Sequence, residues 1–295
     1  MTNKYIEFKK KRELGEILTD TFAFIRSNFK QLFSTILKTS APILVLLVIA
    51  LIFMTYSYSD FIGTIGFDLQ NSSPGSFNSG LMIISILVLV VIGILFYGIL
   101  FGTILHYIKS YIHNQGIIDT EEVKKGVKKD YGRIIGLSLI SGLITGFGFL
   151  LCFLPGIYLY VPMSLVFAIL IFKNLKTFET ISYSFELIKN EWWITFVTLL
   201  VISIIGFFIS GIFAIPAFVY GMLKGFAMAT EGSFSDPSSM VDWISITLSV
   251  IGDLVRYFIM YLLTSVSSAF IYFNLNERKY HTGTLEQIDS LGKPE

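Results

Sequence analysis

The feature that most constrains the fold of this chain is a series of long, nearly uninterrupted apolar runs. Residues 192–214, for example, include no charged residue. About 20 apolar residues suffice for an α-helix to cross the ~30 Å hydrocarbon layer of a bilayer. A helix can do so because it satisfies its own peptide groups where there is no water. The runs predict six transmembrane helices, at residues 32–56, 81–107, 134–153, 157–172, 192–214 and 250–273.

The composition agrees with a membrane protein. Hydrophobic residues make up 54% of the 295 residues and charged residues only 15%, whereas soluble domains carry about 25% charge. We therefore expect an all-α, polytopic membrane protein in one integral domain, residues 1–295, with six transmembrane helices arranged as three hairpins. The net charge of +1 does not favour a nucleic-acid partner.

Amphipathic segments precede the three expected hairpins. Apolar residues recur at helical spacing, opposite charged ones, within residues 1–31, 118–133 and 178–189, a pattern typical of helices that lie in the membrane interface. In the third segment the apolar stripe consists of Phe178, Ile181, Phe185 and Ile188. A polar residue followed by an aromatic one marks each junction between an amphipathic segment and its hairpin, at Asn28-Phe29, Asp130-Tyr131 and Glu191-Trp192. The order predicts a threefold repeat of one cytoplasmic-side interfacial helix followed by two spans.

Turn-forming residues predict where the spans are connected. We expect an external loop at residues 57–80, which contain Asn71-Ser72-Ser73-Pro74-Gly75, and a tight hairpin turn at Leu154-Pro155-Gly156. Pro162 predicts a kink in the fourth span. The fifth span should end near Ala214, before Pro216.

Three further segments complete the expected layout. Residues 217–229 are apolar but short, which predicts an outer-surface or re-entrant segment, and residues 231–239 predict a polar loop. Residues 274–295 should form a cytoplasmic tail.

The distribution of charge predicts the orientation. Lysines and arginines concentrate before the first span, between the second and third, between the fourth and fifth, and after the sixth, as expected for cytoplasmic connections. Acidic residues lie in the other connections, at Asp60, Asp68, Glu231, Asp236 and Asp242. We expect a multi-pass protein of the cytoplasmic (inner) membrane with both termini in the cytoplasm.

A few polar residues are candidates for function. Asp253 and Arg256 lie inside the expected sixth span, where charges are costly and often functional; at this spacing they can also satisfy each other, and we favour the structural pair. His106 is more easily explained as an interfacial hydrogen-bonding residue than as a ligand. Trp192 and Trp193 are expected interface anchors. The basic residues that could contact anionic lipid, or could only fix topology, are Lys124, Lys125, Lys128, Lys129 and Arg133.

The sequence contains no known catalytic or cofactor motif. Its three histidines lie in separate segments, and Cys152 is its only cysteine. We expect no metal site and no cofactor, and we do not expect an enzyme.

Four segments resemble a family of bacterial six-helix membrane proteins that includes the membrane domain of some glycerophosphoryl diester phosphodiesterases. They are Leu14-Gly15-Glu16-Ile17-Leu18, Leu154-Pro155-Gly156-Ile157-Tyr158, Ser182 to Ile188 before Trp192-Trp193, and Tyr272 to Lys279. The stretch from Thr284 to Asp289 is similar to members from Bacteroidota. The phosphodiesterase activity is not implied, because its catalytic barrel needs about 200 or more soluble residues.

The resemblance implies a subunit role, since some relatives are encoded near MoxR-type ATPases and other small membrane proteins. Our leading hypothesis is a non-enzymatic scaffold or subunit of a membrane complex, with membrane lipids and other membrane proteins as partners. The alternative is a transporter or a lipid-handling protein.

Overall fold

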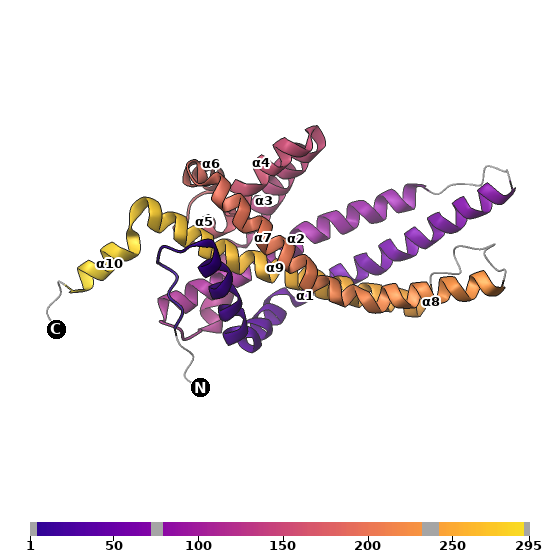
Figure 1. Ribbon diagram of the computed structural model, residues 1–295, viewed down its shortest axis with the longest axis horizontal. Helices are drawn as coiled ribbons and strands as arrows, with labels where there is room; N and C mark the ends of the chain where they lie inside the picture. The colour runs from indigo at the N-terminus through magenta and orange to yellow at the C-terminus, as the bar shows by residue number, and fades with distance from the viewer. Residues whose placement is uncertain (1–4, 72–78, 232–241, 292–295) are drawn as a thin grey trace. The chain divides into compact units, whose positions relative to one another are not determined.

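The computed structural model describes residues 5–71, 79–231 and 242–291, and within them every regular element is a helix (Figure 1). The α-helices are α1 (Leu14–Asn71), α2 (Ser79–His113), α3 (Thr120–Leu151), α4 (Phe153–Met163), α5 (Val166–Lys173), α6 (Thr177–Ile188), α7 (Trp192–Gly211), α8 (Ile215–Glu231), α9 (Trp243–Tyr280) and α10 (Thr282–Leu291). A 3₁₀ turn, η1 (Ile212–Ala214), joins α7 to α8.

Six helical stretches of the described chain are long and apolar enough to cross a membrane. They are Leu14–Tyr58, Gly80–His113, Thr120–Leu151, Phe153–Lys173, Trp192–Thr230 and Trp243–Tyr280. The expected fold class, an all-helical multi-pass membrane protein with six candidate spans, is therefore confirmed.

The chain divides into two compact units. Unit 1 comprises Met1–Ala41, Tyr97–Ile205 and Tyr261–Glu295, and unit 2 comprises Pro42–Phe96 and Gly206–Met260. Helices α1, α2, α7 and α9 contribute residues to both.

The core of unit 1 surrounds α5, whose residues Val166 to Ile171 are all buried. A helix that is apolar on every side is stable only when neighbours enclose it. Aromatic rings extend this core, and Phe8 stacks on Phe270 with ring centroids 4.3 Å apart. The packed core of unit 1 can therefore hold side chains in fixed positions.

Helices α3 and α4 form a tight hairpin in unit 1 (Figure 1). The turn lies at Cys152, which ends α3 and precedes α4, so the expected turn at Leu154-Pro155-Gly156 is wrong by two residues. Pro155 lies in the first turn of α4, where its missing N–H has no helical partner to lose. A β-carbon on Gly148 would lie 2.9 Å from Leu159 Cδ1, so glycine permits the close approach. Helix α4 ends at Met163, beside Pro162, where the sequence predicted a kink in the fourth span.

Two of the three expected interfacial helices are not separate elements. Asn28-Phe29 lies inside α1 and Asp130-Tyr131 lies inside α3, both of which continue without a break. Asn28 does not interrupt α1 because its side-chain amide donates to the carbonyl of Phe24, 3.0 Å away, within the same helix. At the third junction, α6 ends at Ile188 and α7 begins at Trp192.

The expected loop at residues 57–80 is also wrong over much of its length. Helix α1 continues to Asn71 and α2 begins at Ser79, because helix propensity is a weak preference that neighbouring turns of a long helix override. Most of the Asn71 to Gly75 turn and of the loop at residues 231–239, with Asp236, falls outside the described residues. The side chains of Asp60, Asp68 and Glu231 are also outside the part that the structure describes.

Pro216 does not end the fifth helical stretch. The 3₁₀ turn η1 precedes it, and Pro216 then occupies the first turn of α8, a position that proline tolerates. Residues 217–229 therefore continue one apolar stretch, Trp192–Thr230, and do not form a segment separated by a break.

Unit 2 holds α8 beside the start of α9 (Figure 1). Asp242 accepts hydrogen bonds from Lys224 Nζ at 2.7 Å and Tyr220 Oη at 2.6 Å. Its Oδ1 also accepts the N–H of Ser245, whose hydroxyl accepts the N–H of Asp242, so the pair caps α9. Large apolar side chains elsewhere in this unit stay exposed, including Leu87 at 59%, as expected for a surface that faces lipid.

Candidate functional site

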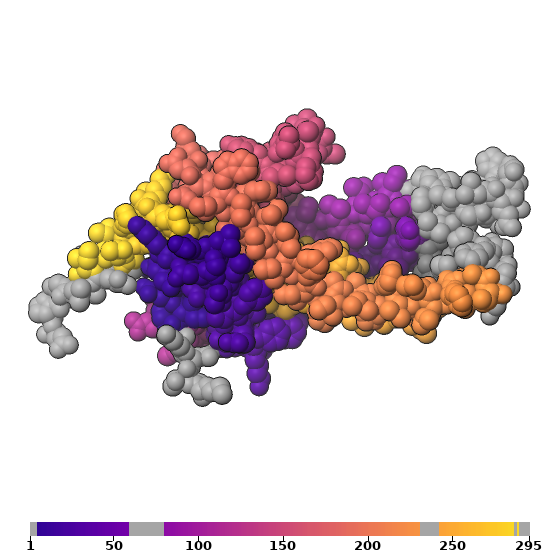
Figure 2. All heavy atoms as spheres, viewed as in Figure 1, coloured from indigo at the N-terminus to yellow at the C-terminus, as the bar shows by residue number. Residues whose placement is uncertain are grey.

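The polar end of α9 joins three parts of unit 1. Asn274 Oδ1 accepts the backbone N–H of Arg12 at 2.8 Å, and Arg278 donates to the carbonyl of Arg12 at 3.1 Å. The Arg12 side chain is buried, lies 2.8 Å from an Asp20 carboxylate oxygen and stacks over Phe270. In Figure 2 the indigo N-terminal residues accordingly lie against the yellow C-terminal ones. These charges hold the N-terminal segment on the bundle.

Glu277, about one turn after Asn274 along α9, has a similar structural task. Its buried carboxylate accepts the N–H of Gly283 at 2.6 Å and both the N–H and the hydroxyl of Thr284, at 3.1 and 2.6 Å. It thereby caps the first turn of α10.

A second polar group, here called the His106 cluster, consists of His106, Asp130, Arg133 and Asn174. His106 Nε2 lies 3.2 Å from Asp130 Oδ2, within the distance of an ion pair. Arg133 pairs with the other Asp130 oxygen and donates to Asn174 Oδ1 at 2.9 Å. Asn174 adopts a left-handed conformation (φ 55°) as it ends α5. The cluster thus fastens α2, α3 and the end of α5.

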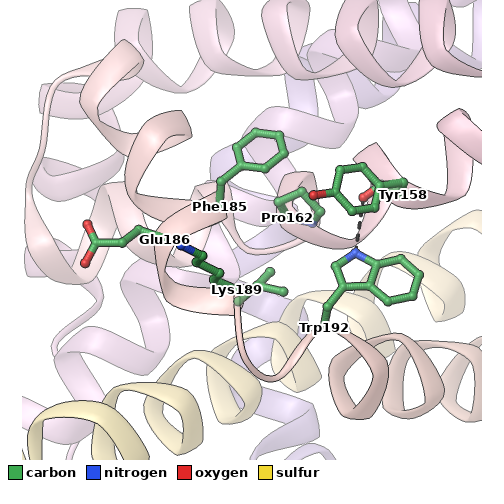
Figure 3. Close-up of a pocket in the computed structure, with 7 residues that line it drawn as sticks. Tyr158, Pro162, Phe185, Glu186, Lys189 and Trp192 are labelled. Carbon is green, nitrogen blue, oxygen red and sulfur yellow. Dashed lines mark hydrogen bonds between the residues drawn. The ribbon is translucent and has the colours of Figure 1, made fainter.

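A third feature is the Trp192 cavity, which has a volume of about 330 Å³. Its lining residues come from α4, α6 and the start of α7: Tyr158, Pro162, Phe185, Glu186, Ile188, Lys189 and Trp192 (Figure 3). Pockets for small molecules typically occupy about 300–1,000 Å³, so this cavity has room for a small group.

One wall of the Trp192 cavity is built from stacked aromatic rings. The Tyr158 and Trp192 ring centroids lie 5.8 Å apart at 21°, and Trp192 stacks on Phe196 at 5.3 Å. Trp192 Nε1 also donates to the Tyr158 carbonyl at 3.4 Å, the dashed line in Figure 3. The wall is therefore formed before any ligand arrives.

The charges at the cavity are unevenly paired. A smaller neighbouring cavity of about 220 Å³ shares Glu186 and Lys189 and adds Glu191, Arg278 and Lys279. Lys279 Nζ lies 2.8 Å from Glu186 and Arg278 lies 3.6 Å from Glu191. The Lys279 ammonium that donates to Glu186 holds the pKa of that carboxyl below its ordinary value. The Lys189 side chain remains unpaired, because it makes no hydrogen bond or ion pair with another described residue.

The candidate residues from the sequence fall in different places. In α9, Arg256 Nη1 lies 3.2 Å from Asp253 Oδ1, so the two charges do pair; a functional role for them stays a prediction. Lys124 pairs with Glu121 at 2.7 Å, and Arg133 belongs to the His106 cluster. The remaining exposed basic residues of α3 are Lys125, Lys128 and Lys129. Their contact with anionic lipid is untested.

The two expected anchors differ in their surroundings. Trp192 is half-buried at the cavity, whereas Trp193 is 73% exposed, with the two ring centroids 4.9 Å apart. A role of either residue as a membrane anchor stays a prediction.

Sequence reasoning missed Asp130, Lys189 and Tyr158 as site residues. Asp130 could have been found from its helical spacing to Arg133, but its contact with His106 joins two helices and leaves no local signal. Among the described side chains, no three His, Cys, Asp or Glu residues are placed to share a metal ion.

No family model, curated protein or solved structure matches this chain. The resemblance to the phosphodiesterase-associated membrane domain therefore stays a prediction.

Proposed function

We propose that this chain is a non-enzymatic protein of the cytoplasmic (inner) membrane, with both termini in the cytoplasm, that serves as a scaffold or subunit of a membrane complex. Its expected partners are membrane lipids and other membrane proteins. The resemblance to the phosphodiesterase-associated membrane domain, itself a proposal, is compatible with such a role.

The observation that supports this proposal is how unit 1 uses its charged residues. Four charged residues link helices or chain segments that are distant in the sequence: Arg12 stacks over Phe270, Asp130 contacts His106, Glu186 pairs with Lys279, and Arg278 pairs with Glu191. Such ties favour a rigid surface, which suits a binding subunit. An enzyme instead needs reactive groups that face a substrate at an accessible site.

Purification in native membrane patches tests the proposal. The full chain with an affinity tag should elute in a particle larger than its own 33.3 kDa plus lipid, with the same partner protein at a fixed ratio in polymer discs and in a mild detergent. An unrelated six-helix protein with the same tag is the control. If the chain is recovered alone under both conditions while it fulfils its cellular role, the scaffold proposal fails.

The Trp192 cavity favours a second candidate function, the handling of lipids. It combines an aromatic wall with a cation, as a headgroup requires. If this candidate is correct, the pure chain in vesicles should move fluorescent phospholipids between leaflets faster than vesicles without protein. An unchanged rate would remove it.

A further inference from the structure

The Trp192 cavity has the chemical character of a headgroup site. Its aromatic and apolar lining residues, Tyr158, Pro162, Phe185 and Trp192, lie around the hollow in Figure 3, while the Glu186 carboxylate points away from them. Amphipathic aromatic residues are typical of the level of the membrane where headgroups meet acyl chains. The cavity is thus suited to a ligand with both polar and apolar parts.

The charge of the region selects an anion. Its two carboxylates, Glu186 and Glu191, are paired with Lys279 and Arg278. Lys189 lines both cavities and supplies one positive charge more than these pairs need. A lysine ammonium is a compact positive charge with three N–H donors. Phosphate oxygens readily accept hydrogen bonds from such a group.

The surroundings supply a place for acyl chains. Beyond the cavity, α7 exposes Trp193, Ile194 and Val197, which are 73%, 51% and 42% accessible. Val197 lies about one turn along α7 from both Trp193 and Ile194, so the three can form a continuous apolar strip. A volume of about 330 Å³ accommodates a headgroup but not the chains, which would remain outside on this strip.

From these three observations we propose that the Trp192 cavity binds the phosphate headgroup of an anionic phospholipid, with Lys189 as its cation and Trp192 as its wall. The proposal rests on the same cavity as the lipid-handling candidate, but binding requires neither a partner protein nor transport, so the binding test can succeed where the tests of both proposed functions fail.

Native mass spectrometry of the full chain tests the site, with phosphatidylglycerol and phosphatidylcholine of identical acyl chains as probes. The wild-type chain should retain phosphatidylglycerol preferentially. Lys189→Gln should lower that retention about fivefold, the effect typical of one lysine at an anionic surface, and Lys189→Arg should restore it. Lys30→Gln is the matched control, because Lys30 is an exposed lysine of α1 outside the cavity and outside the basic residues of α3.

Several results would overturn the site. One is an equal loss in Lys30→Gln and Lys189→Gln, which would indicate unspecific attraction; another is equal retention of both lipids by the wild type. Displacement by soluble glycerol phosphate at the same concentration would indicate a free phosphate site and would contradict the assignment to a lipid.

A photoactivatable phosphatidylglycerol gives a test without substitutions. Its headgroup probe should label wild-type peptides that contain Tyr158, Phe185 or Trp192. Labelling confined to other peptides would also overturn the proposal.

Discussion

Small residues set how closely α2 approaches α3. A β-carbon on Gly102 would lie 2.6 Å from Ile134 Cδ1, and one on Gly98 would collide with the Ser138 hydroxyl. The Ser138 hydroxyl is itself satisfied, because it donates to the Ile134 carbonyl at 2.8 Å within α3. The partner of the Gly98 and Gly102 pair is therefore α3, as small residues at four-residue spacing allow in membranes.

Gly98→Leu should destabilise unit 1 by about 1–3 kcal/mol, the usual cost of overpacking. The added side chain would meet Ser138 and Ile134 and would push α2 from α3. Gly136→Leu is the matched control, since a β-carbon there meets nothing within 4 Å. Unfolding in mixed micelles by increasing the fraction of denaturing detergent measures the difference, and equal stability of the two variants would contradict the packing interpretation.

Asp130→Ala should cost about 1–3 kcal/mol, the penalty of leaving a buried polar partner unsatisfied. The Asp130 side chain is 7% exposed, and its loss would leave Arg133 and His106 without their shared carboxylate. Glu121→Ala, on the same helix, removes an exposed ion pair and should cost less than about 1 kcal/mol. The same detergent titration compares the two, and a similar effect of both would show that the His106 cluster contributes little.

Among the elements, α6 is held to α9 by Glu186 and Lys279. Because Lys279 lowers the pKa of Glu186 in the folded state, this contact stabilises the fold above the ordinary glutamate pKa of about 4.3. The contribution is lost as the pH falls through the lowered pKa.

Glu186→Gln should therefore reduce the midpoint of thermal unfolding at neutral pH, and the difference from wild type should shrink on acidification below about pH 4. Glu13→Gln is the control, because the Glu13 carboxylate has no hydrogen bond or ion pair to another described residue. Thermal scans of the full chain in lipid discs measure both. A constant difference across pH would rule out the charge of Glu186 as the cause.

The third amphipathic pattern predicted a separate helix, α6, but not the face that this helix buries. In α6 the buried residues include Thr180 and Ser184, whereas Phe178, part of the expected apolar stripe, is 76% exposed. In water the apolar face of a helix turns inward, but lipid accepts apolar side chains on the outside, so periodicity alone does not decide which face is buried.

The sequence predicted one of the three expected junctions between an amphipathic segment and a span, and the other two fall inside continuous helices. The break before Trp192 was expected and is present, because α6 ends at Ile188. Polar residues at Asn28 and Asp130 gave false boundaries, since both are satisfied inside continuous helices. Of the Trp192 cavity, the sequence indicated only the tryptophan, because Tyr158 joins it from another helix 34 positions away.

At the scale of the whole molecule, the six candidate spans do not by themselves determine which connections face the cytoplasm. The basic residues predict that the turn between α3 and α4 faces outward. Cys152 lies in this turn, is exposed, and is the only cysteine of the chain. It is therefore a natural probe for sidedness.

A membrane-impermeant maleimide should label Cys152 in intact cells whose outer envelope has been opened. Cys152→Ser should abolish labelling, and Lys125→Cys in that background should react only after the inner membrane is permeabilised, because Lys125 belongs to a predicted cytoplasmic segment. The reverse pattern would invert the orientation. Lys189 precedes the fifth span as Lys125 precedes the third, so the reverse pattern would also place Lys189 at the outer leaflet. The labelling therefore determines from which leaflet the Trp192 cavity could receive a lipid.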